Sequence, residues 1–162
     1  MVQPIGPHVR IGHVHLKVAD IERAIAFYHG VLGFEVKQRW GTDAAFLAAG
    51  DYHHHIGLNT WSSRGGSPPA RGTTGLYHLA ILYPTRALLG DALRRLLAAG
   101  VHLDGASDHG VSEALYLRDP DGNGIELYRD RPASEWPRDA EGNVAMMSDP
   151  IDLEALLRDA AG

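Results

Sequence analysis

Apolar and polar residues alternate along residues 11–18, which is the pattern of a strand with one buried face. The apolar side of this strand carries Val14, Leu16 and Val18. Asp20 can cap a helix that follows, in which apolar residues recur at helical spacing until Gly33, a typical helix stop. Three more strand patterns come next, at residues 34–40, 44–49 and 53–60. The first part of the chain therefore predicts a strand, a helix and three strands.

The same order of elements starts again at residue 76. A strand pattern at 76–83 leads to Thr85, a second candidate cap, and to a helix that stops at Gly100. Three strands are expected after it, at residues 101–103, 113–117 and 124–128. The two halves are separated by a stretch rich in Gly, Pro and Ser at residues 62–74, which reads as a linker.

Two tandem βαβββ modules are therefore expected, at about 11–61 and 75–131, within one domain at 8–136. Neither half, at about 60 residues, would bury much of a core alone. We expect an α+β fold in which the modules form an eight-stranded, open barrel-like mixed sheet, with a metal-binding cavity inside and the helices outside.

The remaining residues, 137–162, form a polar tail with a short helix expected from Pro150 and capped by Asp149. We interpret the tail as a segment that packs on its own domain, with docking to a second subunit as the alternative.

Composition narrows the class of protein. Hydrophobic residues make up 44% of the 162 residues, which excludes a wholly disordered chain. The net charge of −5 argues against nucleic-acid binding. The chain has no cysteine, so disulfides and thiolate metal sites are excluded. No apolar run is long enough for a membrane span, and the first ten residues lack the apolar core of a signal peptide, so we expect a cytoplasmic protein.

Histidine is the residue type that stands out, with ten in the chain. His13 and His78 occupy the same place in the first strand of each half. Glu126 lies in a strand between Ile125 and Leu127, where a carboxylate needs a cation or a hydrogen-bond donor. A single strand histidine is usually structural, but two imidazoles and a carboxylate form a set that holds divalent iron, manganese or a similar ion.

Three stretches of the sequence resemble the vicinal oxygen chelate superfamily, which includes glyoxalase I, bleomycin- and fosfomycin-resistance proteins, methylmalonyl-CoA epimerase and extradiol dioxygenases. HVHLKVADIERAIAFYHGVLGFEV is similar to its opening module. FLAAGDYHHHIGLNTW and DHGVSEALYLRDPDGNGIELYRDRP resemble the bacterial catechol 2,3-dioxygenase-like branch. The resemblance implies that His13, His78 and Glu126 bind a divalent metal ion, with Fe²⁺ expected and Mn²⁺, Zn²⁺ or Ni²⁺ as alternatives.

The resemblance also implies three catalytic residues. A histidine at the end of the first module would act as acid and base, and it maps to His54 within the run His53 to His55. Tyr116, ten residues before Glu126, and His109 would be further active-site residues. In the simpler reading, His53 and His55 face outward and Tyr116 is a core residue.

The resemblance points to an extradiol dioxygenase that acts on a catechol-type aromatic with O₂, in a chain that we expect to be a homodimer. The familiar extradiol enzymes carry two such double modules, whereas this chain has one. Glyoxalase-type members use a fourth metal ligand from the first module, where Asn59 is the expected counterpart of Glu126. The alternatives are a glyoxalase- or epimerase-type isomerase and a non-catalytic protein that binds a small aromatic or an antibiotic.

Overall fold

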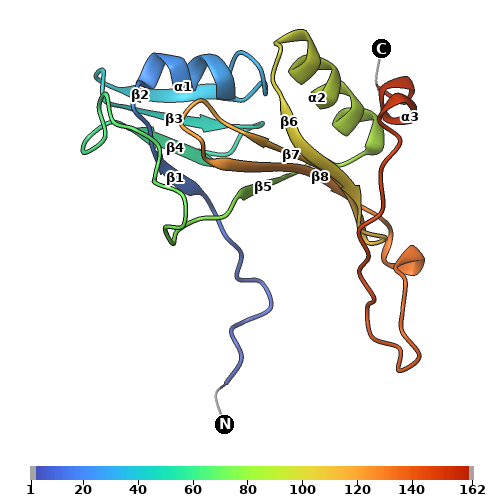
Figure 1. The fold of residues 1–162 in the computed structure, drawn as a ribbon. Coiled ribbons are helices and arrows are strands. Elements are labelled where there is room, and N and C mark those ends of the chain that lie inside the picture. The colour runs from blue at the N-terminus through green and yellow to red at the C-terminus, as the bar shows by residue number, and fades with distance from the viewer. Residues whose placement is uncertain (1–2, 161–162) are drawn as a thin grey trace.

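The computed structural model describes residues 3–160 and contains two βαβββ modules followed by a tail (Figure 1). The first and last two residues, which include the end of the expected tail, lie outside the described residues. The first module consists of β1 (Val14–Lys17), α1 (Ile21–Tyr28), β2 (Glu35–Trp40), β3 (Ala44–Ala48) and β4 (Ile56–Asn59). The second consists of β5 (Leu79–Leu82), α2 (Arg86–Ala98), β6 (Leu103–Asp108), β7 (Ser112–Arg118) and β8 (Gly124–Asp130). The tail contains the 3₁₀ turn η1 (Ala133–Glu135) and α3 (Leu153–Arg158).

Each module forms a four-stranded mixed sheet, with the order β1-β4-β3-β2 in the first and β5-β8-β7-β6 in the second. The outer pairs β1–β4 and β5–β8 are parallel, and the other pairs are antiparallel. Both sheets even carry an irregularity at the same place, between Val36 and Gln38 and between Leu103 and Gly105. The α+β class and the tandem modules are thus confirmed.

The eight strands are divided between two sheets, and no strand pairing joins them within residues 3–160. The eight strands that we expect in one continuous sheet therefore form two four-stranded sheets. The modules are held together by side chains instead. Both long helices lie on the same side of the sheets (Figure 1), and the buried residues of both modules form a single core cluster that includes Leu16, Leu58, Leu115 and Leu127.

A turn between β7 and β8 fastens the second module to the first. The buried Tyr28 hydroxyl of α1 donates to Asp119 Oδ2 at 2.9 Å. Asp121 Oδ1 accepts from the Ala19 N–H at 3.0 Å and from Arg23 Nη2 at 2.6 Å. The turn residues Asp119 to Asn123, which look like a simple turn signal in the sequence, therefore also join the two modules.

The predicted helix starts are confirmed at Asp20 and Thr85, whose side chains accept from backbone N–H groups of the first turn. The tail packs on its own domain, with α3 against α2. Its cap is Asp152 rather than the expected Asp149, because Asp149 pairs with Asp108 at the end of β6. In the part of the chain that the structure describes, no helix is long and apolar enough to cross a membrane.

Candidate functional site

The two first strands begin directly after the two predicted ligand histidines, with His13 before β1 and His78 before β5. In the second sheet Ala80 pairs with Glu126, and in the first sheet the equivalent pair is His15 and Gly57. The counterpart of Glu126 is therefore Gly57. The expectation of Asn59 was wrong because strand register, which sequence spacing does not reveal, sets this equivalence.

In the second module, His78 and Glu126 lie together. His78 Nε2 is 2.9 Å from Glu126 Oε2, and the Glu126 side chain is only 14% exposed. Gly124 makes this approach possible, because a Cβ there would lie 2.1 Å from the Tyr77 carbonyl oxygen and 3.0 Å from His78 Cβ. Tyr116 pairs with Glu126 across β7 and β8, and its hydroxyl lies 3.2 Å from Glu126 Oε1.

Tyr116 also contacts His109, the third residue predicted around this carboxylate. His109 Nε2 lies 2.7 Å from the Tyr116 hydroxyl, and its Nδ1 lies 2.8 Å from the Met147 carbonyl oxygen. Because a carbonyl can only accept, Nδ1 of His109 carries a proton and donates to Met147. The single proton of the Tyr116 hydroxyl points to Glu126 Oε1, with His109 Nε2 on the other side of the same oxygen. Burial, together with the charge of Glu126, raises the pKa of Tyr116 to about 12, so its hydroxyl stays protonated near neutral pH.

Sequence reasoning missed the contribution of Met147. This tail residue fixes the orientation of His109 with its carbonyl, and its N–H donates to the His109 carbonyl at 3.1 Å. Any residue type has these backbone groups, so no signal in the sequence could have identified the position.

In the first module, His13 lies beside His54, with their ring centroids 4.5 Å apart. His54 also packs edge-on against Phe46 at 5.1 Å, and its Nδ1 is 2.7 Å from His53 Nδ1. His55 turns toward the backbone and accepts from the Ala49 N–H at 3.3 Å. Partial burial, followed by the neighbouring His13, lowers the pKa of His54, which favours a neutral imidazole.

His15 occupies the space where a counterpart of the Glu126 side chain would begin. A Cβ on Gly57 would lie 2.9 Å from His15 Cγ, closer than side chains normally approach. The His15 ring also lies 5.6 Å from that of Trp61 and 5.9 Å from that of Phe46. The first module thus has an aromatic face where the second module has a carboxylate.

The structure brings the predicted residues together as two groups, His13 with His54 and His78 with Glu126, Tyr116 and His109. As the side chains stand, no three His, Cys, Asp or Glu residues within 3–160 lie close enough to hold one metal ion. The convergence of His13 with the second group therefore stays a prediction.

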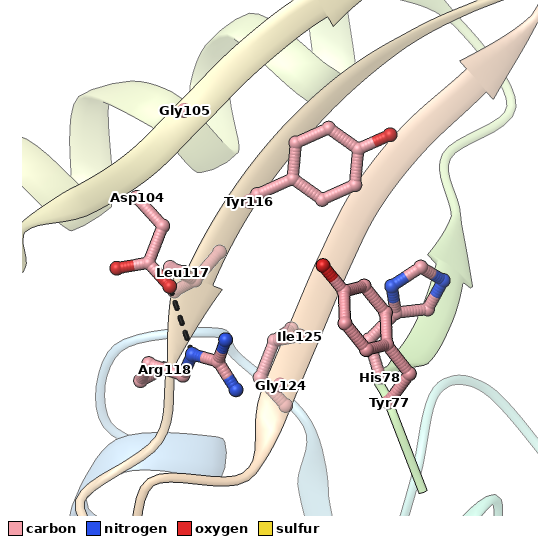
Figure 2. A pocket seen from close by; sticks show the side chains of 9 residues that line it. All are labelled: Tyr77, His78, Asp104, Gly105, Tyr116, Leu117, Arg118, Gly124 and Ile125. Atoms are coloured by element: carbon pink, nitrogen blue, oxygen red, sulfur yellow. Dashed lines mark hydrogen bonds and ion pairs between the residues drawn. The ribbon is translucent and has the colours of Figure 1, made fainter. Parts of the chain in front are cut away.

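A cavity of about 380 Å³ opens beside the second group (Figure 2). His78, Tyr77 and Tyr116 form one side of it, and Asp104 and Arg118 lie opposite them. The cavity places two of the predicted site residues next to a space of the size that small ligands occupy.

Comparisons with known proteins identify the family of the chain. The profile of the Glyoxalase/Bleomycin resistance protein/Dioxygenase superfamily matches residues 10–127. Catechol-2,3-dioxygenase of Bacillus subtilis is 47% identical over 150 residues, which cover 93% of this chain and 52% of that protein. Biphenyl-2,3-diol 1,2-dioxygenase 3 of Rhodococcus globerulus is 34% identical over 77% of this chain and 65% of its own length. This chain thus spans between half and two thirds of these relatives.

Among solved structures, a glyoxalase/dioxygenase from Nostoc punctiforme aligns with a TM-score of 0.65 and 22% identity, over 82% of this chain and 98% of its own. At this level of identity, the likeness concerns the fold.

Proposed function

Because the chain belongs to the Glyoxalase/Bleomycin resistance protein/Dioxygenase superfamily, we propose that it is a metal-dependent extradiol dioxygenase acting on a catechol-type aromatic. In this reaction both atoms of O₂ enter the product, and the ring opens at the C–C bond beside the diol. The proposal is supported by the 47% identity to a protein named catechol-2,3-dioxygenase, which extends over nearly the whole of this chain.

We propose His13, His78 and Glu126 as the metal ligands. The two that belong to the second module already lie side by side, as two donors to one ion would. The 2.9 Å between His78 Nε2 and Glu126 Oε2 fits two neighbouring ligands. Neutral imidazole and carboxylate donors also suit Fe²⁺. A divalent metal ion, Fe²⁺ in our proposal, supplies adjacent open positions at which the catechol oxygens and O₂ can bind.

One observation supports ring cleavage over isomerisation. The first module offers Gly57 where the second offers Glu126, and the His15 ring fills the space above it. A glyoxalase-type site would use a carboxylate from the first module as a fourth ligand. With only three protein ligands, more positions stay open for two reactants.

The remaining site residues handle protons in this proposal. His54, neutral because burial lowers its pKa, accepts a proton from a catechol hydroxyl and later returns it. When substrate is bound, the single proton of the Tyr116 hydroxyl is donated to a substrate oxygen instead of to Glu126, and His109, oriented by Met147, holds the Tyr116 oxygen in place.

Oxygen uptake tests the proposal. Protein loaded with Fe²⁺ under anaerobic conditions should consume O₂ and catechol in a 1:1 ratio, and a Glu126→Gln variant should not. Isomerisation of a thiol adduct without O₂ uptake would favour the isomerase. Catechol binding without turnover, at any metal loading, would favour a binding protein.

A further inference from the structure

The cavity beside Tyr116 ends at an ion pair that the proposed chemistry does not use. Arg118 lies on β7 two residues after Tyr116, and therefore on the same face of the sheet. Its Nε donates to Asp104 Oδ2 at 2.8 Å (Figure 2). Both side chains line the cavity and are about half exposed, at 50% and 43%. The pair is thus accessible to a ligand that enters the cavity.

The cavity is larger than a bare aromatic ring requires. A cavity of roughly 150 Å³ is enough to hold benzene, whereas this one measures about 380 Å³. Gly105, which pairs with Tyr116 across β6 and β7, leaves part of this space open, since a Cβ there would meet nothing within 4 Å. A ring placed beside His78 and Tyr116 therefore has room for a substituent directed toward Arg118.

Most of the hydrogen-bonding capacity of Arg118 is still available. A guanidinium has five N–H donors. Asp104 takes the one on Nε, and the Gly122 carbonyl lies 3.4 Å from Nη1. No other side chain or carbonyl within residues 3–160 accepts from this guanidinium. The terminal amino groups of an arginine match the two oxygens of a carboxylate.

We propose that this cavity is a subsite for the ring substituent of the substrate and that Arg118 selects catechols whose substituent ends in a carboxylate. The identification of the ligand as a catechol rests on the proposed function, whereas the preference for a carboxylate rests on Arg118. Asp104 orients the guanidinium but partly neutralises its charge. The two residues therefore have opposite effects on an anionic ligand.

Two catechols of nearly the same shape test the subsite, one with a carboxymethyl group and the other with its primary amide. Their dissociation constants are measured by calorimetry on the Fe²⁺-loaded protein under anaerobic conditions. Wild type should bind the carboxylate about tenfold more tightly, because a charge-assisted pair replaces a neutral hydrogen bond. Arg118→Gln should remove this preference, and Asp104→Asn should increase it. If the ion pair of Arg118 and Asp104 were only structural, each variant would change the dissociation constants of the two ligands by the same factor.

The chain offers a matched control in a second turn of the same design. Arg138 precedes Asp139 to Asn143 as Arg118 precedes Asp119 to Asn123, and Arg138 Nη1 donates to the Gly142 carbonyl at 2.8 Å. It does not line the cavity. Arg138→Gln should therefore keep the tenfold preference for the carboxylate.

The outcomes separate the subsite from the dioxygenase. Equal affinity of wild type for both ligands, or a preference that survives Arg118→Gln, would overturn the subsite even if the protein cleaves catechol. A carboxylate preference that is lost in Arg118→Gln and increased in Asp104→Asn, in a protein that cleaves no catechol, would support the subsite and refute the dioxygenase.

Discussion

The hydrogen bond from Tyr28 to Asp119 is the contact between the modules whose energetic contribution can be tested most cleanly. Both residues are buried, and Asp119 Oδ2 accepts from the Tyr28 hydroxyl at 2.9 Å and from Asn123 Nδ2 at 2.9 Å. Tyr28→Phe removes only the hydroxyl, so the carboxylate keeps its other donors but loses the one from the first module. A hydrogen bond to a charged group contributes about 1.5–3 kcal/mol.

We therefore expect Tyr28→Phe to lower the free energy of unfolding by about 1.5–3 kcal/mol. For a chain of this size the melting temperature should fall by about 3–12 °C, measured by circular dichroism with thermal and urea unfolding. Tyr83→Phe is the control, because no hydrogen bond within residues 3–160 holds the Tyr83 hydroxyl, and its effect should stay within about 0.5 kcal/mol. Equal losses in the two variants, or none in Tyr28→Phe, would refute the view that this bond joins the modules.

Three further predictions concern single side chains. His54→Phe should leave the metal content intact and lower turnover per bound metal by about 10²–10⁴, and an unchanged rate would remove His54 from the mechanism. Glu113→Ala should lower the free energy of unfolding in urea by about 3–5 kcal/mol, because this buried carboxylate accepts from Arg86 and Arg129. Its removal leaves the Arg129 guanidinium without its carboxylate and leaves Arg86 with its pair to the exposed Asp159, and a loss below about 1 kcal/mol would contradict this. Burial alone would raise the pKa of Asp108, but the Gly110 N–H and Arg131 outweigh it and lower this pKa. The ionised Asp108 carboxylate therefore stabilises the fold above about pH 4, and this stabilisation is lost as the pH falls further. Asp108→Asn should lower the melting temperature at about pH 7 but not near pH 2. A difference in melting temperature between variant and wild type that does not change with pH would refute this.

The repeat of the fold could be predicted because the hydrophobic pattern is strong where one face is buried. The apolar side chains of β1 face the core, and Asp20 and Thr85 cap the two long helices as their residue types suggest. The hydrophobic pattern is weaker in β6. The sequence predicts this strand at residues 101–103, whereas it extends from Leu103 to Asp108. Gly, Ser and Asp are poor strand formers, and pairing with β7 determines the strand there.

The candidate site could be predicted in part. His78, Glu126, Tyr116 and His109 come from one module, and the structure places them in contact. The role of Met147 depends on where the tail returns, which no local pattern encodes. The equivalence of Gly57 with Glu126 depends on strand register, and sequence spacing alone suggested a residue two positions away.

Metal content tests the central claim most directly, since the proposed site draws one ligand from the first module and two from the second. Purified protein loaded with Fe²⁺ under anaerobic conditions and then desalted should hold one ion per chain, measured by atomic emission. His13→Ala, His78→Ala and Glu126→Gln should each lose most of this metal while remaining folded. Wild type without bound metal, or a His13→Ala variant that keeps one ion per chain, would contradict a shared three-ligand site.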